Sequence, residues 1–300
     1  MHNPVMRVGL VLGAGGLSGE AFHRGVLRGL MDGAGWDART AEVIVGTSAG
    51  SLVGAALRAP AQRSSQAHRP RVQEAVPLLP GRAALLAALR RPWKARPGAL
   101  LPAGRIPTDF IEEGVRRRYG SAWAERDLHL VAVRRRDSQR VVFGAPGHPR
   151  PEMACAVAAS CAIPAYFRPV VCDGVAYIDG GVHSPTNADL LATSELDLVI
   201  VSSPMTIARA AVRPRLDLSL RLMWRRTLGT EVRLLRRAGM PVLCVEPDTA
   251  TLARYSMNAV NARNLDEVEE RAYAMTVERL RAPSATPFRA LLAPHLSDSA

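Results

Sequence analysis

Short apolar runs alternate along the first part of this 300-residue chain with segments in which apolar residues recur every three or four positions. Residues 8–12 form the first run, and the segment 20–31 carries its apolar side chains on one face of a helix. The same succession returns with the run 42–45 and the segment 51–57. Short β-branched runs are typical of buried strands, and the wider spacing is typical of amphipathic helices. The pattern therefore predicts two strand–helix units of a parallel sheet.

The rest of the chain continues this alternation. Apolar runs predict four further strands, at 127–133, 140–143, 196–201 and 242–245. Helical spacing predicts helices at 216–237 and 264–281. With 48% hydrophobic residues, the chain can bury the core of one α/β domain over 1–300, with a mainly parallel central sheet flanked by helices. The prolines after position 282 predict a loosely held tail from about 283.

A G-x-S-x-G pentapeptide, 46–50, lies between the second predicted strand and the helix after it. A serine at such a junction occupies a tight turn, where its hydroxyl projects above the sheet edge. The amides that follow it open a helix N-terminus, which favours negative charge. Ser48 is therefore the candidate nucleophile of an acyl transfer, although small residues can also pack a tight turn without any chemistry.

A glycine-rich turn, 13–19, follows the first predicted strand. Successive backbone N–H groups in such a turn form a concavity for an anion, so it can supply donors to the oxyanion that forms when Ser48 attacks a carbonyl. A dinucleotide-binding turn is the alternative. Gly19 lies one position too late for that fingerprint, and the second strand ends in Gly46-Thr47-Ser48 rather than in an acidic residue.

A serine nucleophile needs a group that accepts its proton, and Asp179 is the candidate base. It stands between an apolar run and Gly180-Gly181. Asp173-Gly174 is instead typical of a two-residue hairpin turn between strands at 170–172 and 175–178. We therefore assign Asp173 to a turn and Asp179 to the site.

Together, the turn at 13–19, the pentapeptide at 46–50 and Asp179-Gly180-Gly181 resemble the patatin-like phospholipase family. A fourth segment, 159–167, is similar to that family's A-S-x-A-x-P-x-x-F motif, and the resemblance spans about 5–205. It implies a patatin-like three-layer α/β fold and a serine–aspartate dyad that hydrolyses acyl esters of lipids without a metal or another cofactor. The resemblance makes Ser48 the nucleophile and Asp179 its base, with an oxyanion hole of backbone amides at Gly15, Gly16 and Ala49.

Two positions depart from the family pattern. Ser18 stands where a basic residue is common, and Ala14 stands where a glycine is common. Ser18 is a candidate substrate contact, and the departures bear on head-group preference. They are also the features that favour an alternative, a non-catalytic lipid-binding or membrane-binding protein that keeps the fold.

A serine–aspartate–histidine esterase or thioesterase is a further alternative. His183 and His295 follow Asp179 in the order that α/β-hydrolases use. Only one strand precedes the strand that leads to Ser48, which is few for that fold. His183 is close enough in sequence to the base to contact substrate, whereas His23 is expected to have a surface or packing role on the first helix.

The net charge of +12 is concentrated in the proline-rich segment 59–107, which holds nine Lys/Arg and one acidic residue. Within it, an apolar helix candidate at 83–89 is followed by Trp93 and several cations, a combination typical of an interfacial anchor or a lid. This predicts peripheral contact with an anionic membrane surface, and a solvated, partly disordered insertion is the alternative. With 5% aromatic residues and no recognisable module, nucleic-acid binding is not expected.

The four cysteines show no paired or metal-binding spacing, and they predict reduced thiols. No 18-residue apolar run and no signal-peptide pattern is present. We expect a cytoplasmic protein, peripheral at the inner membrane face.

Overall fold

The computed structural model describes residues 6–59, 101, 103–208, 218–255 and 261–292. Within them, eight strands form one sheet in the order β5-β6-β3-β2-β1-β7-β8, and β4 pairs with β3. The strands are β1 Val8–Leu12, β2 Val43–Thr47, β3 Asp127–Arg134, β4 Arg140–Phe143, β5 Val170–Cys172, β6 Val175–Asp179, β7 Leu198–Ser202 and β8 Val242–Val245. The predicted strands are all present, and the β3-β2-β1-β7-β8 part of the sheet is parallel.

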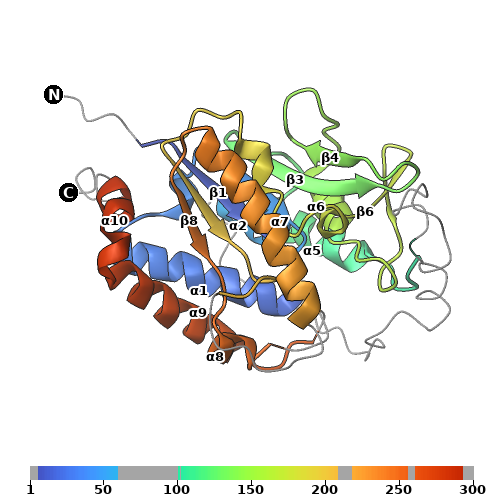
Figure 1. The fold of residues 1–300 in the computed structure, drawn as a ribbon. Coiled ribbons are helices and arrows are strands. Elements are labelled where there is room, and N and C mark those ends of the chain that lie inside the picture. Colours follow the sequence, from blue (N-terminus) through green and yellow to red (C-terminus); the bar gives the residue numbers. More distant parts are fainter. Residues whose placement is uncertain (1–5, 60–100, 102, 209–217, 256–260, 293–300) are drawn as a thin grey trace.

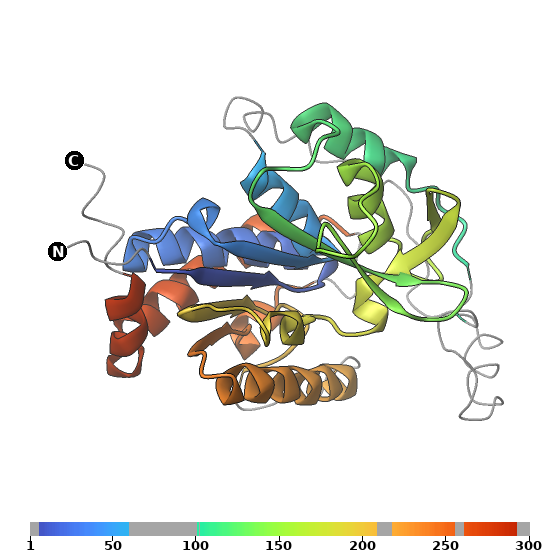
Figure 2. The ribbon, with the colours of Figure 1, turned by 90° about the horizontal axis from the view of Figure 1, so that it is seen from above.

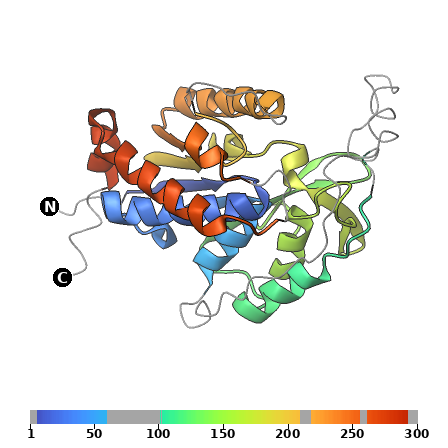
Figure 3. The ribbon, with the colours of Figure 1, turned by 90° about the horizontal axis from the view of Figure 1, so that it is seen from below.

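Helices cover both faces of the sheet, which gives three layers (Figure 1, Figure 2). The helices of at least seven residues are α1 Gly16–Ala34, α2 Ala49–Arg58, α5 Asp109–Tyr119, α6 Met153–Ser160, α7 Leu218–Arg237, α9 Leu265–Arg281 and α10 Thr286–Leu292. Helix α7 lies on one face, and Figure 3 shows α1 and α9 side by side on the other. The expected α/β fold with a mainly parallel sheet is confirmed.

Alternation along the central strands divides the core between the two faces. Leu10, Leu12 and Ile44 belong to the cluster under α1, α2, α6 and α9. Val11 and Val45 belong to the cluster that includes the buried side of α7. Since successive side chains of a strand point to opposite faces, a strand covered on both sides must be apolar throughout. This explains why β1 and β2 are continuous apolar runs.

The predicted hairpin is present, and the part of the predicted loose tail that the structure describes is folded. Asp173 and Gly174 connect β5 to β6 with φ angles of 49° and 77°, as a two-residue turn with two left-handed positions requires. Residues 283–292 form a 3₁₀ turn and α10, in which Leu292 is fully buried. The expectation of a loose segment from 283 does not hold for these residues. The predicted helix at 83–89 lies outside the described residues.

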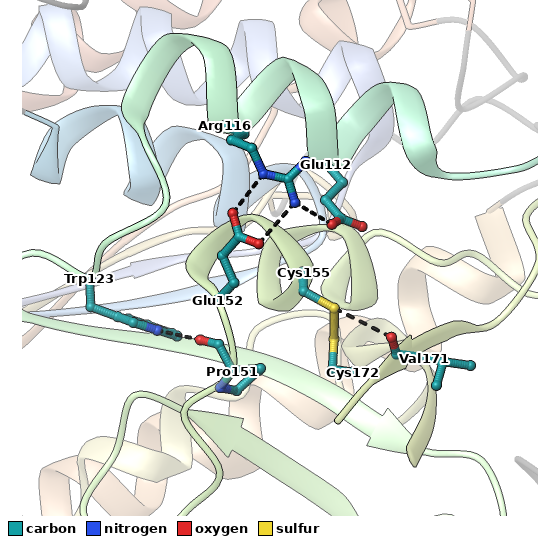
Figure 4. Close-up of a disulfide and its surroundings, with 8 residues drawn as sticks. All are labelled: Glu112, Arg116, Trp123, Pro151, Glu152, Cys155, Val171 and Cys172. Atoms are coloured by element: carbon teal, nitrogen blue, oxygen red, sulfur yellow. Dashed lines mark hydrogen bonds and ion pairs between the residues drawn. A yellow bond between two sulfur atoms is a disulfide. The ribbon is translucent and has the colours of Figure 1, made fainter. Parts of the chain in front are cut away.

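The expectation of four reduced thiols is wrong for two of the cysteines. Cys155 of α6 and Cys172 of β5 form a disulfide (Figure 4), whereas Cys161 and Cys244 are free. Their separation of 17 residues carries no recognisable signal in the sequence. The chain brings them together because β5 returns beside α6 after the turn that follows this helix.

Replacing Cys155 and Cys172 together by alanine should lower the free energy of unfolding by about 3 kcal/mol. The bridge closes a loop of 17 residues, which restricts the unfolded chain by about this amount. Urea unfolding of the oxidised protein, followed by tryptophan fluorescence, measures the change. Cys244→Ala, which leaves the bridge intact, is the control. An oxidised native protein that unfolds at the same urea concentration as the double variant would contradict the bridge.

Candidate active site

Ser48 lies at the turn between β2 and α2, where its backbone has φ 54° and ψ −117°. A non-glycine residue in this region is strained by about 1–3 kcal/mol, so the surrounding structure must hold it. Helix α2 begins very close to the end of β1. A Cβ on Gly50 would lie 1.9 Å from the carbonyl oxygen of Leu12, so no larger residue fits there. The strained turn predicted from the pentapeptide is confirmed.

Three side chains hold the peptide groups of Ser48. Its N–H donates to Oγ of Ser160 at 3.0 Å. Its carbonyl oxygen accepts from Oγ of Ser51 at 2.6 Å and from Sγ of Cys161 at 3.3 Å. Ser51, Ser160 and Cys161 are all buried. The turn is thus fixed on both sides of Ser48 by groups that water does not reach.

Asp179 ends β6 and is buried beside Ser48. Burial raises the pKa of its carboxyl from 3.8 to about 6, because desolvation disfavours the charged form. Hydrogen bonds from the Ser48 side chain and from the N–H of Gly181, at 2.7 Å, act in the opposite direction. A carboxylate with this pKa is largely ionised at pH 7 and can still accept a proton.

Strand β3 sets the spacing between these two residues. Thr47, which precedes Ser48, pairs with Val131, and Asp179 pairs with Ala132, the next residue of β3. Because β4 pairs with 130–133 along the other edge of β3, β2 and β6 follow one another along the same edge. The carboxyl ends of β2 and β6 thus meet, which places Ser48 next to Asp179.

The glycine-rich turn is held by its first two amides. The N–H of Gly13 donates to the Ser202 carbonyl at 3.0 Å, and that of Ala14 donates to the Pro185 carbonyl at 2.7 Å. Gly16 has φ 58° and opens α1. In the described part of the chain, the amides of Gly15 and Gly16 have no hydrogen-bond partner.

The N-termini of α1 and α2 lie beside each other. A Cβ on Gly19 would approach that of Ala49 to 3.6 Å. The Ala49 amide, the first of α2, likewise has no partner among the described residues. Two helix N-termini side by side favour negative charge at this edge of the sheet. The structure thus brings the four predicted segments around Ser48.

The two candidate substrate contacts have different surroundings. Ser18 is buried in the first turn of α1. His183 is exposed and follows the 3₁₀ turn after Asp179. No contact of His183 with Ser48 or Asp179 occurs among the described residues. His295 lies outside them.

His23 is a site-supporting residue that the sequence does not reveal. It is fully buried, and its Nε2 donates to the Gly13 carbonyl at 2.8 Å while its Nδ1 accepts from Oγ of Ser202 at 2.8 Å. Burial lowers the pKa of His23 to about 4, so it stays neutral and keeps this pattern. The packing role expected for His23 is correct, and the segment that it supports is the glycine-rich turn.

Glu231 of α7 supports the other side of this turn. Its carboxylate accepts from the hydroxyls of Ser184 and Thr186, the first at 2.6 Å. Burial raises the pKa of Glu231. These bonds fix the segment around Pro185, whose carbonyl oxygen accepts a hydrogen bond from the N–H of Ala14. In the sequence, the only indication of this role is that Glu231, a polar residue, lies on the apolar face of an amphipathic helix.

No group of three or more His, Cys, Asp or Glu among the described residues could hold a metal ion. None of the helices in this part of the chain has the length and apolar character needed to cross a bilayer.

Comparisons with known proteins give one family match. The family model described as patatin-like phospholipase matches residues 10–192. VipD from Legionella pneumophila has a similar solved structure, with a TM-score of 0.46 and 11% identity over 97% of this chain and 67% of VipD. The type III effector protein ExoU aligns with a TM-score of 0.38 and 15% identity over 93% of this chain and 53% of ExoU. None of the curated proteins matches the chain.

Proposed function

Because this chain belongs to the patatin-like phospholipase family, we propose that it is a serine hydrolase that cleaves acyl ester bonds of lipids through a Ser48–Asp179 dyad. The observation that carries the proposal is the pairing of a strained, buried serine with a buried carboxylate whose pKa is raised to about 6. A general base is most effective when its pKa lies near the working pH. Asp179 meets that condition and touches the hydroxyl it would deprotonate.

The first half of the reaction forms an acyl-enzyme. Asp179 accepts the proton of the Ser48 hydroxyl as Oγ attacks the carbonyl carbon of the ester. The resulting oxyanion receives hydrogen bonds from the amides of Gly15, Gly16 and Ala49, whose helix N-termini favour its charge. The protonated Asp179 then gives its proton to the leaving alcohol as the C–O bond breaks.

The second half restores the enzyme. A water molecule replaces the alcohol, Asp179 accepts one of its protons, and the hydroxide attacks the acyl carbon. The tetrahedral intermediate collapses, Ser48 departs with the proton from Asp179, and the fatty acid leaves. No cofactor takes part in this sequence of steps.

A lipid panel tests the proposed reaction and its substrate class. Vesicles that contain a phospholipid, a lysophospholipid or a diacylglycerol are incubated with the native chain and with Ser48→Ala, and mass spectrometry quantifies the fatty acid released. Release that depends on Ser48 supports a phospholipase A or lysophospholipase type of activity. Binding to the vesicles without release from any lipid would favour the non-catalytic alternative. Thioester hydrolysis that requires His183 would favour the triad alternative.

Contact with an anionic membrane surface belongs to the same proposal. The basic segment that first suggested it, 59–107, lies largely outside the described residues. In the described part, the start of α7 offers a second surface: Leu220, Leu222 and Met223 are 48%, 40% and 51% exposed. Arg226 is exposed beside them. Apolar side chains next to an exposed cation fit the boundary between head groups and acyl chains.

This end of α7 lies at the same edge of the sheet as the site. Arg221 donates to the carbonyl oxygens of Pro204 and Thr206, at 2.9 and 3.3 Å. A Cβ on Gly15 would lie 2.8 Å from Pro204. A bilayer that receives the start of α7 is therefore close to the turn that carries the proposed oxyanion hole.

The triple variant L222Q/M223Q/R226Q should sediment markedly less with vesicles of mixed phosphatidylcholine and phosphatidylglycerol. It removes two of the three exposed apolar side chains together with the cation. The control R233Q/L234Q/R237Q removes one exposed apolar side chain and two exposed cations at the far end of α7, one cation more than the first variant, and should sediment like the native chain. Equal sedimentation of the native chain and the first variant would contradict the assignment of this surface.

A further inference from the structure

The carboxyl end of α6 touches both residues of the proposed dyad. Helix α6 ends at Ser160, and Cys161 and Ala162 follow it. The hydroxyl of Ser160 accepts the N–H of Ser48 at 3.0 Å, and Cys161 donates to the carbonyl of Ser48 at 3.3 Å. The carbonyl of Ala162 accepts the N–H of Asp179 at 3.0 Å. Three consecutive residues thus bond the backbone of both.

Ser160 also connects this end of the helix to β3, the strand that pairs with both β2 and β6. Its hydroxyl hydrogen goes to the carbonyl oxygen of Val131 on β3, at 2.6 Å. The single hydroxyl therefore donates to β3 and accepts from Ser48 at once. Since Ser160 is fully buried, no water can replace either bond.

The rest of α6 is anchored at two further places (Figure 4). Arg116 of α5 donates to both carboxylate oxygens of Glu152, at 2.7 and 2.9 Å, just before α6 begins. The Cys155–Cys172 disulfide ties the middle of the helix to β5, which pairs with β6. Strand β6 carries Asp179. The helix is thus fixed to the strand of the base and bonded directly to the nucleophile.

We infer that Ser160 is a positioning residue, through which the carboxyl end of α6 sets the Ser48 hydroxyl against the Asp179 carboxylate. The inference rests on the proposed function. Without the Ser160 hydroxyl, the strained Ser48 peptide loses the acceptor of its N–H, and a buried unpaired N–H favours relaxation of the turn. A relaxed turn separates the Ser48 hydroxyl from its base.

Ser160→Ala tests this role, with a soluble short-chain ester as substrate and a fluorophosphonate as a probe of the nucleophile. We expect kcat and the rate of labelling to fall together by about tenfold to a hundredfold, with KM nearly unchanged. The acidic limb of the pH profile should also move to higher pH. Ser48 lowers the pKa of Asp179 through its hydrogen bond, so its withdrawal raises that pKa.

Thr276→Val is the matched control, because it likewise removes one buried hydroxyl and its bond, here to Ala272 in α9. It should lower the melting temperature without changing the labelling rate or the pH profile. If Ser160→Ala does not fold, Cys161→Ala removes a contact to the same peptide group and should slow labelling by a smaller factor.

The possible results distinguish the positioning role of Ser160 from the proposed function. A native chain that reacts with the probe at the same rate and pH dependence as a folded Ser160→Ala variant overturns the positioning role and leaves the proposed function intact. A folded native chain that never reacts at Ser48 overturns the proposed function itself.

Discussion

Ser48→Ala should lower ester hydrolysis by at least about three orders of magnitude while the protein remains folded. The serine hydroxyl is the atom that forms the acyl-enzyme, and no other group can replace it at this turn. The backbone at Ser48 is held by Ser51, Ser160 and Cys161 through its peptide groups, which alanine keeps. The fold should therefore tolerate the change.

Hydrolysis of a chromogenic short-chain ester and a thermal melt measure the two parts of this expectation. Ser219→Ala, a change of the same kind at an exposed position on α7, is the control and should behave like the native chain. A Ser48→Ala variant with native turnover would remove the nucleophile from the mechanism.

Asp179→Asn should lower kcat by about two to four orders of magnitude, because the amide cannot accept the proton of Ser48. The variant keeps an oxygen that can receive the N–H of Gly181. Asp173→Asn is the matched control: this residue lies exposed in the hairpin turn with φ 49°, which asparagine tolerates. It should retain native activity, and comparable activity of the two variants would contradict the role of Asp179 as base.

The raised pKa of Asp179 adds a pH dependence to this comparison. Its ionised form is the base, so native kcat/KM should fall as the pH drops through about 6. The ionised form of Asp179 supports activity but lowers stability. A carboxyl whose folded pKa lies above its unfolded pKa destabilises the fold once both states are ionised. At pH 8, Asp179→Asn should therefore melt at a higher temperature than the native chain. Near pH 3.5 the difference should largely vanish.

Local patterns were sufficient to predict the elements that carry the chemistry. The first strand begins and ends where the apolar run does, at Val8–Leu12, because a strand covered on both faces is apolar throughout. The turn at Ser48 and the hairpin at Asp173 each depend on a few adjacent residues. The order of these segments also indicated the family, which the match over 10–192 shows.

Features that depend on distant contacts could not be predicted in the same way. Helix α6, Met153–Ser160, is apolar and alanine-rich on every side, so it shows no helical period. The bond from His23 to Gly13 and the disulfide between Cys155 and Cys172 each join segments that only the sheet topology brings together. The helix at the carboxyl end was missed because three prolines dominate that segment.

Mapping the covalent adduct of a fluorophosphonate on the native chain tests the central claim most directly. After reaction at pH 8, peptide mass spectrometry should find a single modified residue, Ser48, and Ser48→Ala should carry no adduct. Asp179→Asn should react at a small fraction of the native rate, whereas Asp173→Asn should react at the native rate. A folded native chain that remains unmodified in the presence of anionic vesicles, or that is modified elsewhere, would contradict a Ser48–Asp179 dyad.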